Sequence, residues 1–124
     1  MEAMLNQQAA RQVYTLCYRI TACPQAARVA TQEALADPRP LPKAVALCVE
    51  RTPGLEHGAV ASAGCTPLER ALLSLPWRQR LALVLLDQLG LAPDEAARWA
   101  QLPQRELTRL CYDGRLALTK AMAG

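Results

Sequence analysis

The sequence predicts an all-α protein made of two small helical subdomains joined by a linker. Of its 124 residues, 52% are hydrophobic, and Ala and Leu supply many of these, whereas aromatic residues make up only 4% and Phe is absent. Small and straight-chain apolar residues favour helices, whereas β-branched and aromatic residues favour strands. Apolar residues also recur at spacings of three and four, the period of a helix buried on one side, with no sustained alternation of period two.

Proline and glycine divide the chain into two halves. The cluster from Asp37 to Pro42 contains three prolines and is expected to break any helix. Residues 52–65 are rich in Gly, Pro and small side chains, a composition typical of a flexible linker. We therefore predict a helical half at residues 1–51, a linker at 52–65 and a second helical half at 66–124. About three helices should precede the linker and about four should follow it.

Three apolar stripes predict the helices of the N-terminal half. The second helix should begin at Pro24, because proline suits a first helical position, and should run to about Ala36. A short third helix should follow Pro42. In chain order, the residues expected to be buried are Leu5, Ala9, Val13, Leu16, Cys17 and Ile20, then Ala27, Ala30, Ala34 and Leu35, then Ala44, Val45, Leu47 and Cys48.

The C-terminal half has clearer helix boundaries. Thr66-Pro67-Leu68-Glu69 is a capping box with proline at the first helical position. A second helix follows Leu75-Pro76 and stops at Gly90. A third opens at Pro93 with Asp94 and Glu95 in its first turn, where carboxylates favour the helix dipole. A last helix begins near Pro103. The residues expected to be buried are Leu68, Leu72 and Leu75, then Leu81, Val84, Leu85 and Leu89, then Leu107, Leu110, Cys111, Gly114 and Leu118.

The segment from Pro93 to Leu110 has the spacing of a helix-turn-helix. The first helix of that motif needs a small residue where its partner crosses it, and Ala97 occupies this position. Gln101 stands where the turn prefers glycine, at a small cost in strain. The second helix would then present outward the side chains that contact bases and phosphates in a major groove. The predicted DNA-binding residues are Gln104, Arg105, Thr108, Arg109, Tyr112, Arg115 and Lys120.

Two stretches of the chain carry a resemblance to a known protein family. The first is Leu68-Glu-Arg-Ala-Leu-Leu-Ser-Leu-Pro-Trp-Arg-Gln-Arg80, followed by Gly90-Leu91, Glu95 and Ala97. It is similar to region four of RNA polymerase sigma factors of the extracytoplasmic-function group. Cys17 to Leu35, especially Gln32-Glu33, is similar to region two, whose helix docks on the polymerase clamp in the family. The resemblance implies a transcription factor that binds promoter double-stranded DNA and core RNA polymerase. It implies that the polymerase-binding residues are Arg28, Gln32 and Glu33.

Departures from region two leave a second hypothesis open. Arg28 and Val29 stand where family members usually carry acidic residues, and a proline-rich loop replaces the aromatic, basic stretch that melts promoter DNA in the family. Single-stranded DNA is held by aromatic stacking and basic grooves, and this half has only Tyr14 and Tyr18 to stack. The alternative is a degenerate sigma mimic that binds an anti-sigma factor or polymerase without reading DNA.

Other classes of function are disfavoured. The single His, the absence of a triad in motif context and the absence of a glycine-rich phosphate loop argue against an enzyme and against catalytic residues. The five cysteines have no Cys-x-x-Cys spacing, and His57 with Cys65 is too few ligands for zinc, so we expect free thiols, no metal and no cofactor. A net charge of +3 is compatible with nucleic acid. Without a secretory leader or an apolar run that could span a bilayer, we expect a cytoplasmic protein with no membrane partner.

Overall fold

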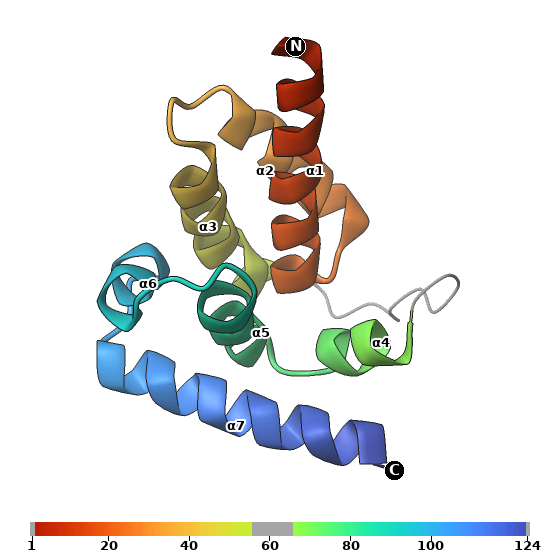
Figure 1. Cartoon of the computed structure of the whole chain (residues 1–124), viewed down its shortest axis with the longest axis vertical. Helices are drawn as coiled ribbons and strands as arrows, with labels where there is room; N and C mark the ends of the chain where they lie inside the picture. The colour runs from red at the N-terminus through yellow and green to blue at the C-terminus, as the bar shows by residue number, and fades with distance from the viewer. Residues whose placement is uncertain (1, 56–65, 124) are drawn as a thin grey trace. The chain divides into compact units, whose positions relative to one another are not determined.

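Helices account for all the regular structure of the described chain (Figure 1). The structure is a computed structural model that describes residues 2–55 and 66–123, with side chains from residue 7 onward. Within these ranges no segment is a strand, so the predicted all-α fold class is confirmed. The chain divides into two units, Met1–Leu55 and Glu56–Gly124. Residues 56–65 of the predicted linker lie outside the described ranges.

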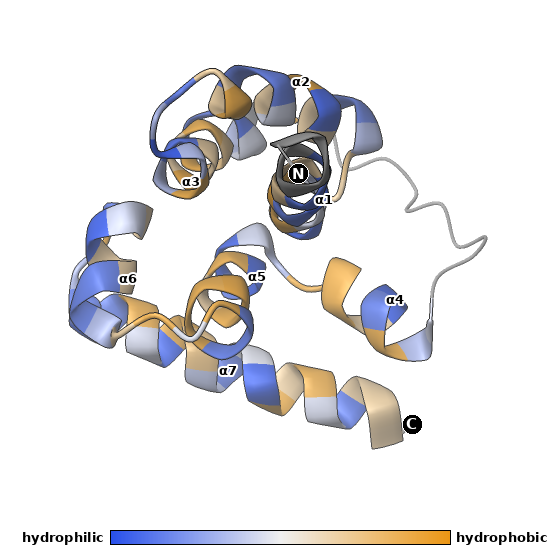
Figure 2. Ribbon diagram, turned by 45° about the horizontal axis from the view of Figure 1, so that its top comes forward, coloured by the Kyte–Doolittle hydropathy of each residue, from blue (hydrophilic) through white to orange (hydrophobic). Residues whose placement is uncertain are grey.

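Three helices that pack against one another make up the first unit, and Figures 1 and 2 show them side by side. They are α1 (Glu2–Thr21), α2 (Pro24–Leu35) and α3 (Pro40–Arg51), followed by a short 3-10 helix, η1 (Thr52–Gly54). The apolar stripes of the three helices meet in one core, as the sequence predicts. Its buried residues include Val13, Leu16, Cys17, Ile20, Ala27, Ala30, Ala34, Ala44, Val45, Leu47 and Cys48.

Several details of the first unit differ from the sequence prediction. Leu35 is 39% exposed rather than buried, because neighbouring helical residues are rotated by about 100° and Ala34 takes the inward position. Ala9 is only half-buried, and the side chain of Leu5 lies outside the described atoms. The third helix begins at Pro40, not after Pro42. The first amides of a helix have no intrahelical acceptor, so prolines in its first turn cost no hydrogen bond.

The first unit also continues beyond Arg51. η1 packs on α3, and Thr52, the first residue of the predicted linker, is buried. The amide of Leu55 donates to the carbonyl of Thr52 at 3.0 Å and closes this turn. Residues 52–55 of the predicted linker therefore belong to the first unit.

The second unit is arranged around its last helix, against which three other helices pack. Thr66 caps the first of these helices as predicted, with its Oγ1 accepting from the amide of Glu69 at 3.1 Å. Leu68 is 53% exposed, contrary to the prediction, because it lies in the first turn of that short helix while Leu72 and Leu73, one turn later, reach the core. The elements are α4 (Pro67–Leu73), α5 (Trp77–Leu83), η2 (Val84–Gln88), α6 (Pro93–Ala100) and α7 (Gln104–Ala123).

Close packing between α5 and α7 forms the core of this unit. Leu81 and Leu85 from the α5 side and Leu107 from α7 are fully buried, and Figure 2 shows hydrophobic segments on both α5 and α7. Gly114 allows the two helices to approach, since a Cβ at this position would lie 3.0 Å from Leu83 Cδ1. Leu89, Leu110 and Leu118, which were also expected inside, are half-buried.

A π-helical turn, η2, extends α5 and ends at Gly90. The amide of Leu89 donates to the carbonyl of Val84 at 2.9 Å, five residues back instead of four. A π turn inserts one extra residue and rotates the residues that follow it relative to an α-helix. Gly90 has a φ of 66°, a left-handed conformation that glycine adopts without strain, and it stops the helix as predicted.

A buried arginine fixes the turn between α4 and α5. Arg80 is 3% exposed, and its guanidinium donates to the carbonyl of Leu75 and, at 3.4 Å, to that of Leu73. Carbonyls at the end of a helix lack amide partners, so these bonds satisfy groups that the turn leaves open. Burial lowers the pKa of the Arg80 guanidinium to about 10, which leaves it cationic at neutral pH.

Replacing Arg80 should therefore destabilise the second unit strongly. We expect Arg80→Ala to reduce the free energy of unfolding by about 3 kcal/mol, because two buried carbonyls lose charged donors and a cavity opens. The matched control is Arg78→Ala, which removes an exposed guanidinium 5.4 Å from the Trp77 ring in the same helix. Urea unfolding measures both variants, and equal losses would contradict this role for Arg80.

The left-handed turn after α6 gives a second stability prediction. Gln101 has φ 58° and ψ 41°, a conformation that costs L-residues with a Cβ about 1 kcal/mol. Gln101→Gly should therefore raise the free energy of unfolding by about 1 kcal/mol, measured by thermal and urea unfolding. Gln101→Ala retains the Cβ and should leave stability nearly unchanged. A loss of stability in the glycine variant would show that the side chain of Gln101 contributes more than its backbone costs.

Candidate nucleic-acid interface

The helices α6 and α7 form a helix–turn–helix pair joined by the three residues 101–103. Ala96 and Ala100 are fully buried and Ala97 nearly so, which lets α6 pack closely on α7. The turn is closed by the amide of Leu102, which donates to the carbonyl of Ala97 at 3.2 Å. Leu107 is fully buried and fixes the inner face of α7. The opposite face of α7 is therefore held outward.

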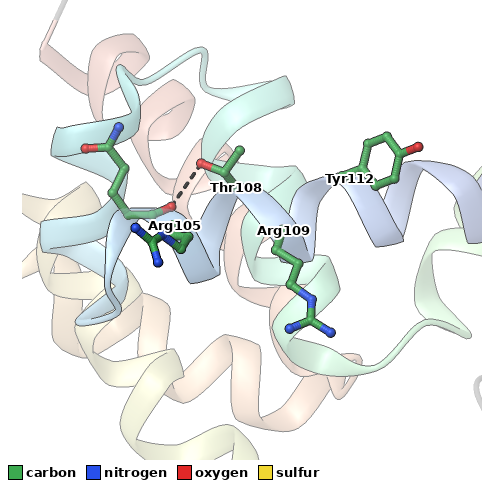
Figure 3. Close-up of a pocket in the computed structure, with 5 residues that line it drawn as sticks. Arg105, Thr108, Arg109 and Tyr112 are labelled. Atoms are coloured by element: carbon green, nitrogen blue, oxygen red, sulfur yellow. Dashed lines mark hydrogen bonds between the residues drawn. The ribbon is translucent and has the colours of Figure 1, made fainter.

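Five of the predicted DNA-binding residues meet on this outward face. They line one shallow, open groove on the surface of α7 (Figure 3). Arg105 and Arg109 are exposed, and Figure 3 shows the guanidinium group of Arg109 extending away from the helix. Tyr112 is 61% exposed one turn further along. The lining residues are Gln104, Arg105, Thr108, Arg109 and Tyr112.

The polar contacts within this groove are few. The hydroxyl of Thr108 donates to the carbonyl of Gln104 at 2.9 Å, so its oxygen can still accept a hydrogen bond. Arg109 Nε lies 3.9 Å from a carboxylate oxygen of Asp113, and the Arg109 side chain is 83% exposed. Such an exposed pair contributes little, and the arginine can turn to another anion. The groove therefore offers two accessible cations with hydrogen-bonding groups between them.

Arg115 and Lys120 do not line this groove. Lys120 is exposed near the end of α7. Arg115 forms a two-point ion pair with Asp87 of η2: its Nε donates to Oδ2 at 2.9 Å and its Nη2 donates to Oδ1. The thiol of Cys111 also lies 3.9 Å from Asp87 Oδ1. Of the predicted cationic contacts, Arg115 is thus the one tied to another helix of the unit.

The ion pair shifts the titration of its carboxyl group. Hydrogen bonding to Arg115 holds the pKa of Asp87 below its usual value. A carboxyl whose folded pKa is depressed stabilises the fold above its unfolded pKa, near 4, and that contribution disappears as the pH falls through the folded pKa. The Asp87–Arg115 pair is therefore fully formed at neutral pH.

The pairing of Asp87 with Arg115 was not predicted from the sequence. Asp87 lies 28 residues from Arg115, and no local motif connects the two. The π turn decides which way Asp87 faces, and the apolar pattern of the sequence does not reveal that turn. An acidic residue at the end of an apolar helix, with a long basic helix after it, was the only available signal.

The predicted polymerase-binding residues lie on α2 in the first unit. Arg28, Gln32 and Glu33 are exposed, whereas Ala27, Ala30 and Ala34 on the opposite face of α2 are buried. Glu33 is not free, because its carboxylate pairs with Arg51 of α3 at 2.5 Å. The pair borders a second shallow groove. Its lining residues are Cys23, Gln25, Ala26, Val29, Glu33, Arg51 and Leu55.

The described thiols are free, and two of them lie together in the core of the first unit. Cys17 and Cys48 are fully buried, and hydrogen bonding to Cys17 together with burial raises the pKa of Cys48 well above the usual thiol range. Cys23 and Cys111 are free as well. His57 and Cys65 lie outside the described residues. Among the residues described, no three His, Cys, Asp or Glu side chains form a group that could hold a metal.

The chain matches no protein-family model and no curated protein. None of the described helices combines the length and the apolar character needed to cross a membrane.

Proposed function

We propose that this protein is a sigma-like transcription factor that binds promoter double-stranded DNA through α7 and docks on core RNA polymerase through α2. The main support for this proposal is the outward face of α7, the second helix of a helix–turn–helix pair. There Arg105, Thr108 and Arg109 line one exposed groove. A recognition helix presents its N-terminal, outward residues to the major groove in this way. The proposal includes a cytoplasmic location and no catalytic role.

The chemistry of the groove suits a nucleic acid. The guanidinium of arginine pairs with phosphate oxygens or with the O6 and N7 edge of guanine, and Gln104 can pair with adenine. Arg105 and Arg109 are four residues apart and so project from the same side of α7. Thr108 and Tyr112 add hydroxyl groups that can reach phosphates. Together these groups supply both charge and hydrogen bonding along one helix face.

The first unit supports the second part of the proposal. Docking on a polymerase requires an exposed polar surface backed by a rigid helix, and the exposed Gln32 and Glu33 stand on a helix whose opposite face is packed core. The Glu33–Arg51 pair places the carboxylate at the edge of a groove. An exposed pair of this kind is weak enough to exchange partners on binding.

One observation favours the alternative, a degenerate mimic that binds an anti-sigma factor or polymerase without reading DNA. Val29 is 45% exposed, and it shares its groove with Ala26 and Leu55. An apolar side chain where sigma factors usually carry acidic residues is a departure from the clamp-docking helix of that family, and it suits a different protein partner, such as an anti-sigma factor. Direct measurement of DNA binding separates the two functions.

The proposed DNA contact predicts the effect of removing each arginine. Arg105→Ala and Arg109→Ala should each weaken binding to duplex promoter DNA, and each lost phosphate contact should flatten the dependence of log K on log salt by about 0.9. A lost base contact should cost about 1–3 kcal/mol. Fluorescence anisotropy at several salt concentrations measures both. Without binding by the wild-type protein at low salt, the DNA-reading function is wrong and the mimic is favoured.

Two control variants distinguish a direct DNA contact from a general effect of charge and from a loss of folding. Arg70→Ala removes the same charge from an exposed site on α4 and should change DNA affinity little. Leu107→Ala removes a fully buried side chain and should instead lower the free energy of unfolding by about 2–5 kcal/mol. If Leu107→Ala lowers DNA affinity only in proportion to the fraction of protein that is unfolded, Leu107 has a structural role.

The polymerase contact predicts a separate effect. Replacing both Gln32 and Glu33 by Ala should reduce co-purification with core RNA polymerase while leaving the melting temperature nearly unchanged, because both side chains are exposed. The matched control replaces an exposed Gln and an exposed Glu elsewhere in the same unit, Gln12 and Glu50, by Ala. Equal polymerase association for the two double variants would contradict docking through α2.

A further inference from the structure

The ion pair between Asp87 and Arg115 lies beside the proposed DNA-binding face. Arg115 follows Thr108 by seven residues, which is nearly two helical turns, so the two side chains leave α7 in almost the same direction about 10 Å apart. Arg115 is 58% exposed in its side chain and Asp87 is 36% exposed. Solvent, and any anion in it, can therefore reach the pair.

The carboxylate satisfies Arg115 at the positions that a phosphate would use. An arginine guanidinium binds carboxylate and phosphate through the same planar, two-point geometry, here through Nε and Nη2. The π turn of η2 belongs to the segment that carries Asp87, and its extra residue sets the direction in which Asp87 points toward α7. The contact joins two helices 28 residues apart and thus depends on the fold of the unit.

We propose that Asp87 acts as an internal competitor for phosphate: it occupies the Arg115 guanidinium and thereby weakens the binding of α7 to the backbone of duplex DNA. This inference rests on the proposed function. Phosphate contacts supply affinity without sequence information, whereas base contacts supply specificity. Because Asp87 occupies one cation that would otherwise bind the DNA backbone, it lowers non-specific binding. It leaves the base-reading residues Gln104 and Arg105 unaffected.

The strength of the pair sets the size of the effect. The loss of an exposed ion pair changes a binding constant by about 1.5- to 5-fold. A phosphate must displace Asp87 before it can bind Arg115, so the wild-type protein binds the DNA backbone less tightly by about this factor. The pair therefore modulates affinity and does not switch it off.

The test is a double-mutant cycle in duplex binding, with a mixed-sequence DNA as the probe. Asp87→Asn retains the shape of the side chain but removes its charge, and it should raise affinity at low salt by about 1.5- to 5-fold. It should also steepen the slope of log K against log salt by about 0.9, since one more phosphate is contacted. In an Arg115→Ala background, Asp87→Asn should give no gain. Thermal unfolding of each variant, with Asp87→Ser as a second neutral replacement, verifies that the protein is folded.

Each outcome has one meaning. A gain that persists in the Arg115→Ala background would come from the general loss of negative charge and would overturn the competition. No gain from Asp87→Asn in an otherwise binding-competent protein would also overturn it, and would leave the pair a structural contact. If neither the wild type nor Asp87→Asn binds duplex DNA, the proposed function fails and the competition fails with it.

Discussion

The contact between α5 and α7 is the constraint on which the second unit depends. Gly114 brings the two helices so close that a Cβ there would lie 3.0 Å from Leu83 Cδ1, and the buried Leu107 fixes the rotation of α7 two turns earlier. A helix held tightly along one side can present the other side in only one orientation. The exposed row that includes Arg105 and Arg109 is therefore a direct consequence of the packing beneath it.

The position of α5 depends in turn on two unusual features at its ends. At its beginning, the buried Arg80 guanidinium binds the carbonyls of the turn from α4, which fixes where α5 enters the core. At its end, the π turn adds one residue before Gly90, and Asp87 faces α7 from this turn. Because the same helix provides the packing surface for α7 and the carboxylate for Arg115, the core and the charge pattern of the surface are coupled.

Local signals in the sequence predicted much of this fold, but they did not predict contacts between residues far apart in the chain. The helix cap at Thr66, the stop at Gly90 and the left-handed turn at Gln101 each depend on a few adjacent residues, so the sequence alone can predict them. The left-handed Ala22 between α1 and α2, with φ 55°, was not predicted, since alanine gives no sign of that conformation. Asp87 pairs with Arg115, 28 residues away, and the helical period of the sequence does not predict that contact. Arg80 binds carbonyls only five and seven residues back, but the helical pattern does not predict that a charged residue is buried there.

The sequence predicted which face of α7 is exposed, but it did not predict the ion pairs on that face. Helical spacing suffices to place Gln104, Arg105 and Thr108 on one exposed face, because an α-helix has a fixed period. The same helical spacing predicts that Arg115 is another exposed cation on this face. Only the folded unit pairs it with Asp87, and a cation already paired contributes less to the binding of a polyanion than an unpaired one.

The distribution of charge along α7 has a consequence for how such a helix would bind DNA. Arg109 lies near Asp113 and Arg115 is paired with Asp87, whereas Arg105 at the N-terminal end of α7 forms no ion pair with a described residue. Acidic partners thus accumulate toward the C-terminal part of the face, where contacts would fall on the DNA backbone. The N-terminal part, which enters the groove in a helix–turn–helix, retains the more available cation. Affinity should then be modest and weighted toward base contacts, because the helix offers little unopposed charge to phosphates of any sequence.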